Sequence, residues 1–189
     1  MLVAVGKSVM QWLNLMRELK RKGLVDLIFP EFFDSKNDLI ARRWIAYLRR
    51  LRKLENEVKV AAWPDYCYDA RLRGKFSVEW LFPLHKASEL DFALKVADYI
   101  GFLNCGWLRD YTLARYVEWK REYGFKAWLM GLKPRYLRAL HLFDACDITA
   151  VSLPGYNFSE WRKLNRAEVW EEFLRQIKAR RTTLDGWLG

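Results

Sequence analysis

The sequence predicts a single-domain α/β protein over residues 1–189, a compact or incomplete (β/α) barrel with about seven parallel strands. Short apolar runs alternate with longer amphipathic stretches. The apolar runs are predicted strands and the amphipathic stretches are predicted helices. A helix that connects two strands returns the chain to the same edge of the sheet, which makes the strands parallel. The length fits one domain, and no linker or repeat divides it. Because a complete eight-unit barrel takes about 250 residues, a trimmed barrel is favoured, with a doubly wound parallel sheet as the alternative.

The strands are predicted from short apolar runs, and the helices from apolar side chains at helical spacing. In the first helix Trp12, Met16 and Leu19 share one face, and Gly23 follows as a helix stop. The predicted strands cover residues 2–5, 25–33, 58–63, 77–82, 99–103, 126–131 and 148–153. The predicted helices cover 8–22, 38–54, a segment that starts at 88, 110–123, 135–143 and 159–180.

The formal net charge of +10 favours a polyanionic partner, with nucleic acid (DNA or RNA) as the expected one. A phosphate-contacting surface is predicted on the second helix and in the loop after the third strand. A solvated outer face of a barrel helix is the alternative interpretation. The residues of this predicted surface are Arg49, Arg50, Arg52, Arg71, Arg73 and Lys75.

Composition and spacing exclude several classes of protein. Hydrophobic residues make up 52% of the chain, which excludes a disordered protein. The three cysteines are widely spaced and form no Cys/His cluster, so we expect reduced thiols and no structural zinc site. No cofactor is expected, and no residue is assigned as a metal ligand. No apolar run reaches the ~20 residues of a membrane span, and no basic region precedes the first strand as in a signal peptide. These features predict a cytoplasmic protein without a membrane partner, and they leave its oligomeric state open.

Two further features of the sequence carry expectations of their own. Two Gln residues beside abundant Lys, Arg and Glu favour a thermophilic source. Gly6-Lys7-Ser8 after the first strand resembles the end of a phosphate-binding loop, but the Gly required five residues before Gly6 is replaced by Met1. A tight strand-to-helix turn is therefore favoured there, and a single phosphate held by the helix N-terminus is the alternative.

Polar side chains follow several of the predicted strands. In a parallel barrel the strand carboxyl ends meet at one rim, where catalytic groups lie. Paired carboxylates at this rim would act as nucleophile and general base or bind a divalent metal, whereas the alternative is that they cap helices. The expected rim residues are Asp34 after the second strand, Asp65 and Asp69 after the third, His85 after the fourth, Asn104 after the fifth, and Lys133 and Arg135 after the sixth.

Three segments resemble parts of the tRNA-guanine transglycosylase superfamily, particularly its archaeal, phage and viral members implicated in 7-deazaguanine modification of DNA. They are Phe33-Asp34-Ser35, the strand segment 60–65 ahead of Asp69, and the late segment 126–131 with 143–150. The resemblance spans roughly residues 25 to 155. It implies a (β/α) barrel that exchanges bases in a nucleic acid, with Ser35 and Asp147 among the binding residues. For a viral protein it implies the host cytoplasm.

The chain also departs from this family. If the late segment is aligned on Asp147, the nucleophilic aspartate of the tRNA enzymes falls on Ala150, and the zinc-ligand cysteines are missing. Transglycosylase chemistry would then depend on Asp34 as nucleophile or base-recognition group, Asp65 as general acid/base or base-recognition group, or Asp147. The alternatives are a non-catalytic basic protein that binds DNA or RNA, and a phosphate-ligand barrel enzyme with its anion near Gly6-Lys7.

Overall fold

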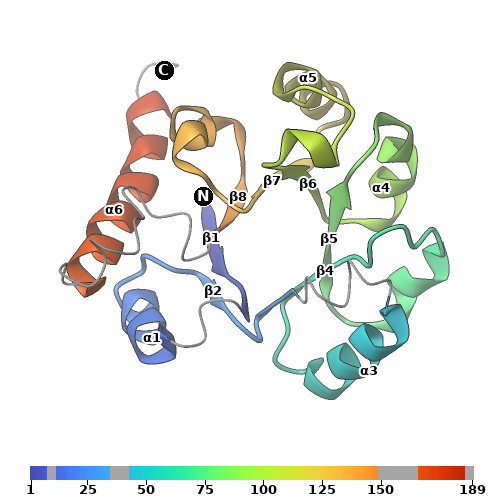
Figure 1. The fold of residues 1–189 in the computed structure, drawn as a ribbon, viewed down its shortest axis with the longest axis horizontal. Coiled ribbons are helices and arrows are strands. Elements are labelled where there is room, and N and C mark those ends of the chain that lie inside the picture. The colour runs from blue at the N-terminus through green and yellow to red at the C-terminus, as the bar shows by residue number, and fades with distance from the viewer. Residues whose placement is uncertain (8–11, 35–42, 149–165, 186–189) are drawn as a thin grey trace.

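The chain forms a nearly closed barrel of parallel strands with helices around its outside (Figure 1). The computed structural model describes residues 1–7, 12–34, 43–148 and 166–185. Eight strands lie within these residues: β1 (Leu2–Val5), β2 (Leu27–Ile28), β3 (Phe32–Phe33), β4 (Val60–Ala62), β5 (Glu79–Leu84), β6 (Tyr99–Leu103), β7 (Lys126–Met130) and β8 (Ala145–Ile148). Every pair of hydrogen-bonded neighbours is parallel, as predicted.

The order of the strands decides between a barrel and a doubly wound sheet. It runs β2-β1-β8-β7-β6-β5-β4-β3, so it follows the chain round a ring without the reversal that a doubly wound sheet requires. The helices lie on the outer side of this ring (Figure 1). They are α1 (Leu13–Arg21), α3 (Trp44–Leu54), α4 (Leu90–Val96), α5 (Leu113–Tyr123) and α6 (Arg166–Asp185). Among the described residues, no helix is both long and apolar enough to cross a membrane.

The second predicted strand is two short strands, which corrects the expectation for residues 25–33. β2 pairs with β1 and β3 pairs with β4, while β2 and β3 are not hydrogen-bonded neighbours. Between them the Glu31 N–H donates to the Ile28 carbonyl at 2.7 Å, which closes a turn. Pro30 in this turn has no N–H to give to a ladder. The barrel therefore has a seam between β2 and β3.

The last predicted strand is displaced. It covers Ala145–Ile148 rather than residues 148–153, of which 149–153 lie outside the described residues. The carboxylates of Asp144 and Asp147 are both hydrogen-bonded to β7. The segment before it, predicted as a helix over 135–143, is a 3₁₀ helix over Pro134–Leu142. The predicted helix starts near 8, 38 and 159 also lie outside the described residues.

Side chains that point into the barrel form one apolar layer to which each of the described strands contributes a residue. These residues are buried, and Phe32 stacks on Trp128 with ring centroids 5.0 Å apart. The layer consists of Ala4, Leu27, Phe32, Val60, Leu81, Tyr99, Trp128 and Ala145. A second, larger core fills the space between the strands and the surrounding helices. The interior is therefore packed across its middle, and space for a ligand is left towards the ends of the strands.

Buried tyrosines tie the outer layer to the barrel. The Tyr47 hydroxyl on α3 donates to the Ala62 carbonyl on β4 at 2.6 Å, and the Tyr116 hydroxyl on α5 donates to the Ile100 carbonyl on β6 at the same distance. Both rings are fully buried. A buried carbonyl without a partner is destabilising, so these bonds fix the distance between each helix and its strand.

The replacement Tyr47→Phe should therefore destabilise the fold. It leaves the Ala62 carbonyl without this donor, and we expect the free energy of unfolding to fall by about 1–2 kcal/mol. Urea denaturation followed by tryptophan fluorescence measures the change. Tyr123→Phe is the matched control, because Tyr123 is exposed on α5 and its replacement should change stability little. Equal stabilities of the two variants would contradict this role of the Tyr47 hydroxyl.

Candidate active site

A pocket of about 170 Å³ lies at the carboxyl ends of the strands. It contains five of the candidate site residues, four predicted to follow strands and one, Asp147, taken from the family resemblance, and these come from separate parts of the barrel. They are Asp34, Asp65, His85, Asn104 and Asp147. Its walls are apolar and include Phe32, Pro83, Leu103 and Met130. Asp34 and Asp65 therefore open into the same pocket, which is the geometric requirement for a pair of carboxylates to act on one substrate.

Asp65 and His85 form the electrostatic centre of this pocket. The His85 Nε2 lies 3.8 Å from the Asp65 Oδ1, and both side chains are nearly buried, with 9% and 13% of their surface exposed. Burial raises the pKa of Asp65 above its usual range. The nearby His85 lowers this pKa in part, and the Glu89 carboxylate raises it. Asp65 is therefore suited to hold a proton and to pass it to a bound molecule.

Two neighbours fix the position of His85. The Glu89 side chain, which is buried, accepts hydrogen bonds from the backbone N–H groups of His85 at 2.8 Å and Lys86 at 2.9 Å. The Tyr66 ring stacks on the imidazole with centroids 5.0 Å apart, although Tyr66 has the left-handed φ of 60° that is uncommon for a residue other than glycine. His85 is therefore held from its backbone and from one ring face.

Asp34 lies against the turn after β1. Its Oδ1 accepts a hydrogen bond from the Lys7 backbone N–H at 3.1 Å. A Cβ atom on Gly6 would lie only 2.5 Å from the Asp34 Oδ1 and 2.7 Å from its Oδ2. Gly6 was predicted to form a tight turn, and the structure adds that its missing side chain makes room for a pocket carboxylate. No pattern within one segment could have indicated this, because the two residues are far apart in the chain.

Asp147 connects β8 with β7 and with the loop after β7. Its Oδ1 accepts hydrogen bonds from the Trp128 indole N–H and from the Gly131 backbone N–H, both at 3.0 Å. Gly131 has a left-handed φ of 65°, and its carbonyl accepts a hydrogen bond from the Asn104 side-chain amide. Asp147 and Asn104 thus both hold the loop after β7, so a structural task accounts for part of their placement.

Cys105 is a pocket residue that the sequence did not single out. Its thiol donates to the Asn104 Oδ1 at 2.9 Å, and the Lys133 ammonium lies 3.6 Å from its sulfur. Lys133 and Arg135 do not line the pocket themselves. The Arg135 guanidinium donates to the Asn104 carbonyl, so these two cations brace the loop after β6 from outside. The only signal for Cys105 in the sequence is its place directly after Asn104.

Asp69 does not line the pocket, so the structure does not bring it together with the other two carboxylates predicted to be catalytic. Its carboxylate caps the 3₁₀ helix η2 (Ala70–Lys75) through the Arg71 backbone N–H and also pairs with the Arg71 guanidinium at 2.8 Å. The Arg71 side chain lowers the pKa of Asp69. Asp69 therefore stays ionised as a helix cap, the alternative that the sequence left open. Ser35 lies outside the described residues.

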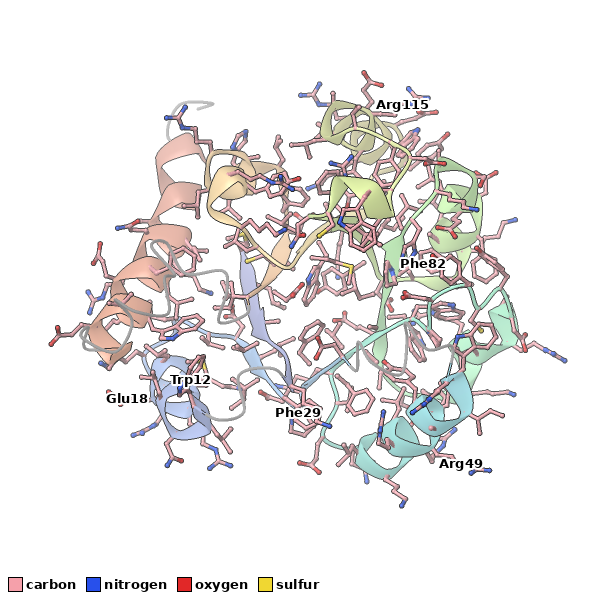
Figure 2. All side chains as sticks on the ribbon, viewed as in Figure 1. Trp12, Glu18, Phe29, Arg49, Phe82 and Arg115 are labelled. Carbon is pink, nitrogen blue, oxygen red and sulfur yellow. The ribbon has the colours of Figure 1, made fainter. Side chains whose placement is uncertain are left out.

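The predicted basic surface is only partly brought together. Arg49, Arg50, Arg52 and Lys75 line a groove of about 720 Å³ along α3, and Figure 2 shows Arg49 pointing away from the barrel. Arg71 and Arg73 do not line this groove. The Arg73 guanidinium is paired with both oxygens of Asp98 at 2.7 Å, and Arg71 is paired with Asp69. Four of the six residues predicted for the basic surface therefore line one groove.

No cluster of three or more metal-ligating side chains is found in the part of the chain that the structure describes. The pocket carboxylates contact other groups of the protein. The His85 ring lies beside Asp65, the Lys7 backbone N–H donates to Asp34, and the Trp128 indole N–H donates to Asp147. The arrangement can therefore supply a proton donor and a carboxylate to the same bound molecule through its own side chains.

The raised pKa of Asp65 predicts a pH-dependent stability. The folded protein holds this proton more tightly than the unfolded chain. The resulting stability is full below the ordinary Asp pKa of about 4 and is lost as pH rises through the raised pKa. Asp65→Asn cannot ionise, so its unfolding free energy relative to the wild type should increase from pH 4 to pH 8. Urea denaturation at each pH measures it.

Asp69→Asn is the control for this experiment. The pKa of Asp69 is lowered, so any stability from its charge is present at high pH and is lost as pH falls, which is the opposite sign. At this exposed position the effect should be small. A difference between Asp65→Asn and the wild type that stays constant across the pH range would contradict the burial of an ionisable Asp65.

The chain was also compared with known proteins. No family model matches it. It is 26% identical over 195 residues to the uncharacterized protein ORF192 of Acidianus two-tailed virus, and the alignment covers 97% of this chain and 98% of that protein. Neither finding tests the resemblance to transglycosylases, which stays a hypothesis. The chain is similar, over nearly its whole length, to a protein of an archaeal virus.

Proposed function

We propose that this chain is an enzyme that breaks or exchanges a glycosidic bond of a nucleotide or nucleic acid in the pocket at the barrel rim. The observation that carries the proposal is the nearly buried Asp65, with its raised pKa, beside His85 and in the same pocket as Asp34. Two carboxyl groups in different environments are the usual arrangement for separate acid and base roles. The net charge of +10 favours a substrate with phosphate groups.

The size of the pocket limits what enters it. Its volume of about 170 Å³ is close to the ~150 Å³ of an engineered protein cavity that holds benzene. One heterocyclic base or one sugar ring therefore fits, and the rest of a larger substrate must stay outside. The apolar walls, which include Phe32 and Met130, suit the faces of a ring, while the polar groups suit its edge.

The chemistry follows from the two carboxyl groups. Protonated Asp65 gives its proton to the leaving base as the bond between base and anomeric carbon breaks and its electron pair moves to the base. The Asp34 carboxylate stabilises the positive charge at the anomeric carbon or forms a bond with it. Water or an incoming base then attacks this carbon and loses a proton, which returns to Asp65. Between these steps the His85 ring stays beside the Asp65 carboxylate and stabilises its charge.

A non-catalytic nucleic-acid-binding protein is the second candidate. The groove along α3, with its exposed arginines, favours it because such a surface can bind phosphates without any reaction. This candidate gives the nearly buried Asp65 no role in function. Replacement of Asp65 should then leave nucleic-acid binding unchanged, and no base release or exchange should be seen with either protein. The two candidates therefore differ in what a change at Asp65 does.

The test is base release or exchange from a panel of nucleotides and oligonucleotides, followed by mass spectrometry. Asp65→Asn keeps the shape of the side chain but cannot donate the proton. Turnover should therefore fall by about 100-fold or more while binding is retained. Asp69→Asn, a carboxylate outside the pocket, should turn over like the wild type. Equal turnover by the wild type and Asp65→Asn would remove the proton-donor role of Asp65, and no turnover on any member of the panel would favour the binding protein.

A second variant tests Asp34 without changing it. Gly6→Ala places a methyl group where the Asp34 carboxylate lies, so it should lower turnover about as much as Asp34→Asn. Gly6 is not among the glycines with positive φ in the described residues, so alanine suits its backbone. Gly74→Ala is the matched control, because a Cβ there meets nothing within 4 Å. If Gly6→Ala keeps full turnover while Asp34→Asn loses it, the close contact between Gly6 and Asp34 does not position the carboxylate.

A further inference from the structure

A second cavity adjoins the active-site pocket. It has a volume of about 210 Å³ and lies between the turn after β1, the seam residues Phe29 and Phe33, and the helix α3. Figure 2 shows Phe29 between α1 and α3. Asp34 lines both this cavity and the active-site pocket, so a ligand that fills both passes beside one side chain. Nothing in the proposed reaction uses this second cavity.

The cavity is positively charged. Three cationic side chains of the described residues line it, Lys7 from the end of β1 and Arg50 and Lys53 from α3, against one carboxylate, Asp34. The lining therefore carries two net positive charges. The Asp34 carboxylate already accepts the Lys7 backbone N–H, which offsets part of its charge towards a neighbouring anion. Arginine and lysine together are the side chains that proteins use to bind phosphate groups.

We propose that this cavity is a phosphate subsite that holds a phosphoryl group of the substrate while the attached base or sugar occupies the active-site pocket. The position of the subsite rests on the cavity and its cations, and the identity of the group in the pocket rests on the proposed function. Two net positive charges match a phosphate monoester, which carries nearly two negative charges at neutral pH. The subsite would thus select phosphorylated over unphosphorylated substrates.

The cavity also connects to the groove along α3. Arg50 and Lys53 line both, whereas Lys7 lines only the cavity and Arg49 only the groove. A strand whose first phosphate lies at Lys7 would continue past Arg49 and Lys75. A free nucleotide would use the cavity alone. The phosphate chemistry is the same for both sources, so residues that line only one of the two spaces can tell them apart.

Binding of ribose 5-phosphate tests the subsite without any assumption about the base. Its affinity is measured by titration calorimetry at low salt beside that of ribose, for the wild type and for the double variant Lys7→Ala/Lys53→Ala. We expect the wild type to bind ribose 5-phosphate at least tenfold more tightly than ribose, and the double variant to lose this preference. Lys95→Ala, an exposed lysine on α4, is the control and should bind like the wild type.

Arg49→Ala and a 5′-phosphorylated trinucleotide then identify the source of the phosphate. Arg49→Ala should leave ribose 5-phosphate binding unchanged. A several-fold loss for the trinucleotide supports the subsite on a strand, and no loss supports it on a free nucleotide. Equal affinities of the wild type for ribose and ribose 5-phosphate, or an unchanged preference in the double variant, would overturn the subsite. If the wild type prefers ribose 5-phosphate over ribose but turns over no substrate, the proposed reaction is removed and the phosphate subsite is still supported.

Discussion

The alternation of side chains along short parallel strands is the constraint on which both the core and the pocket depend. Inward-facing residues recur every second position. Phe32 and Ala145 belong to the apolar layer inside the barrel, and the next inward positions on the same segments are Asp34 and Asp147. On β5, Leu81 belongs to this layer, and the alternation continues through Pro83 to His85. Because all these strands are parallel, the polar residues emerge at one rim.

This geometry explains how a charged group can be buried at the pocket. An isolated carboxylate in an apolar environment shifts its pKa until it holds a proton. Two effects oppose each other at Asp65: burial raises its pKa and favours the protonated form, and the nearby His85 lowers its pKa and favours the carboxylate. The Tyr66 stack and the Glu89 hydrogen bonds hold His85 in place, so the balance does not depend on a mobile side chain. The same burial that disfavours the charge favours the protonated form of the Asp65 carboxyl group.

Features that depend on neighbouring residues in the chain could be predicted from the sequence, and features that depend on packing could not. The apolar runs indicated the strands, and the first polar residue after several of them, such as Asp34 and His85, reached the pocket. Asp69 lies four residues beyond Asp65, where the chain has already turned into a 3₁₀ helix, so its carboxylate caps that helix instead. The close approach of Gly6 to Asp34 joins segments that no local pattern connects.

The seam between β2 and β3 links this packing to the second cavity. A continuous strand over residues 25–33 would form backbone hydrogen bonds with β1 on one side and with β4 on the other. The turn at Phe29–Glu31 interrupts this strand. The Glu31 carboxylate stabilises the turn, since it accepts the Ile28 N–H at 3.2 Å and pairs with Lys20 and with Lys59. These contacts lower the pKa of Glu31, so its charge and the turn persist in neutral solution.

Phe29 follows β2 directly. Its N–H still donates to the Val5 carbonyl of β1 at 3.0 Å, and its side chain forms a wall of the cavity beside Asp34. The interruption that keeps the barrel from closing therefore also forms one wall of the space beside the active-site pocket. The seam and the second cavity thus share two residues, Phe29 and Phe33.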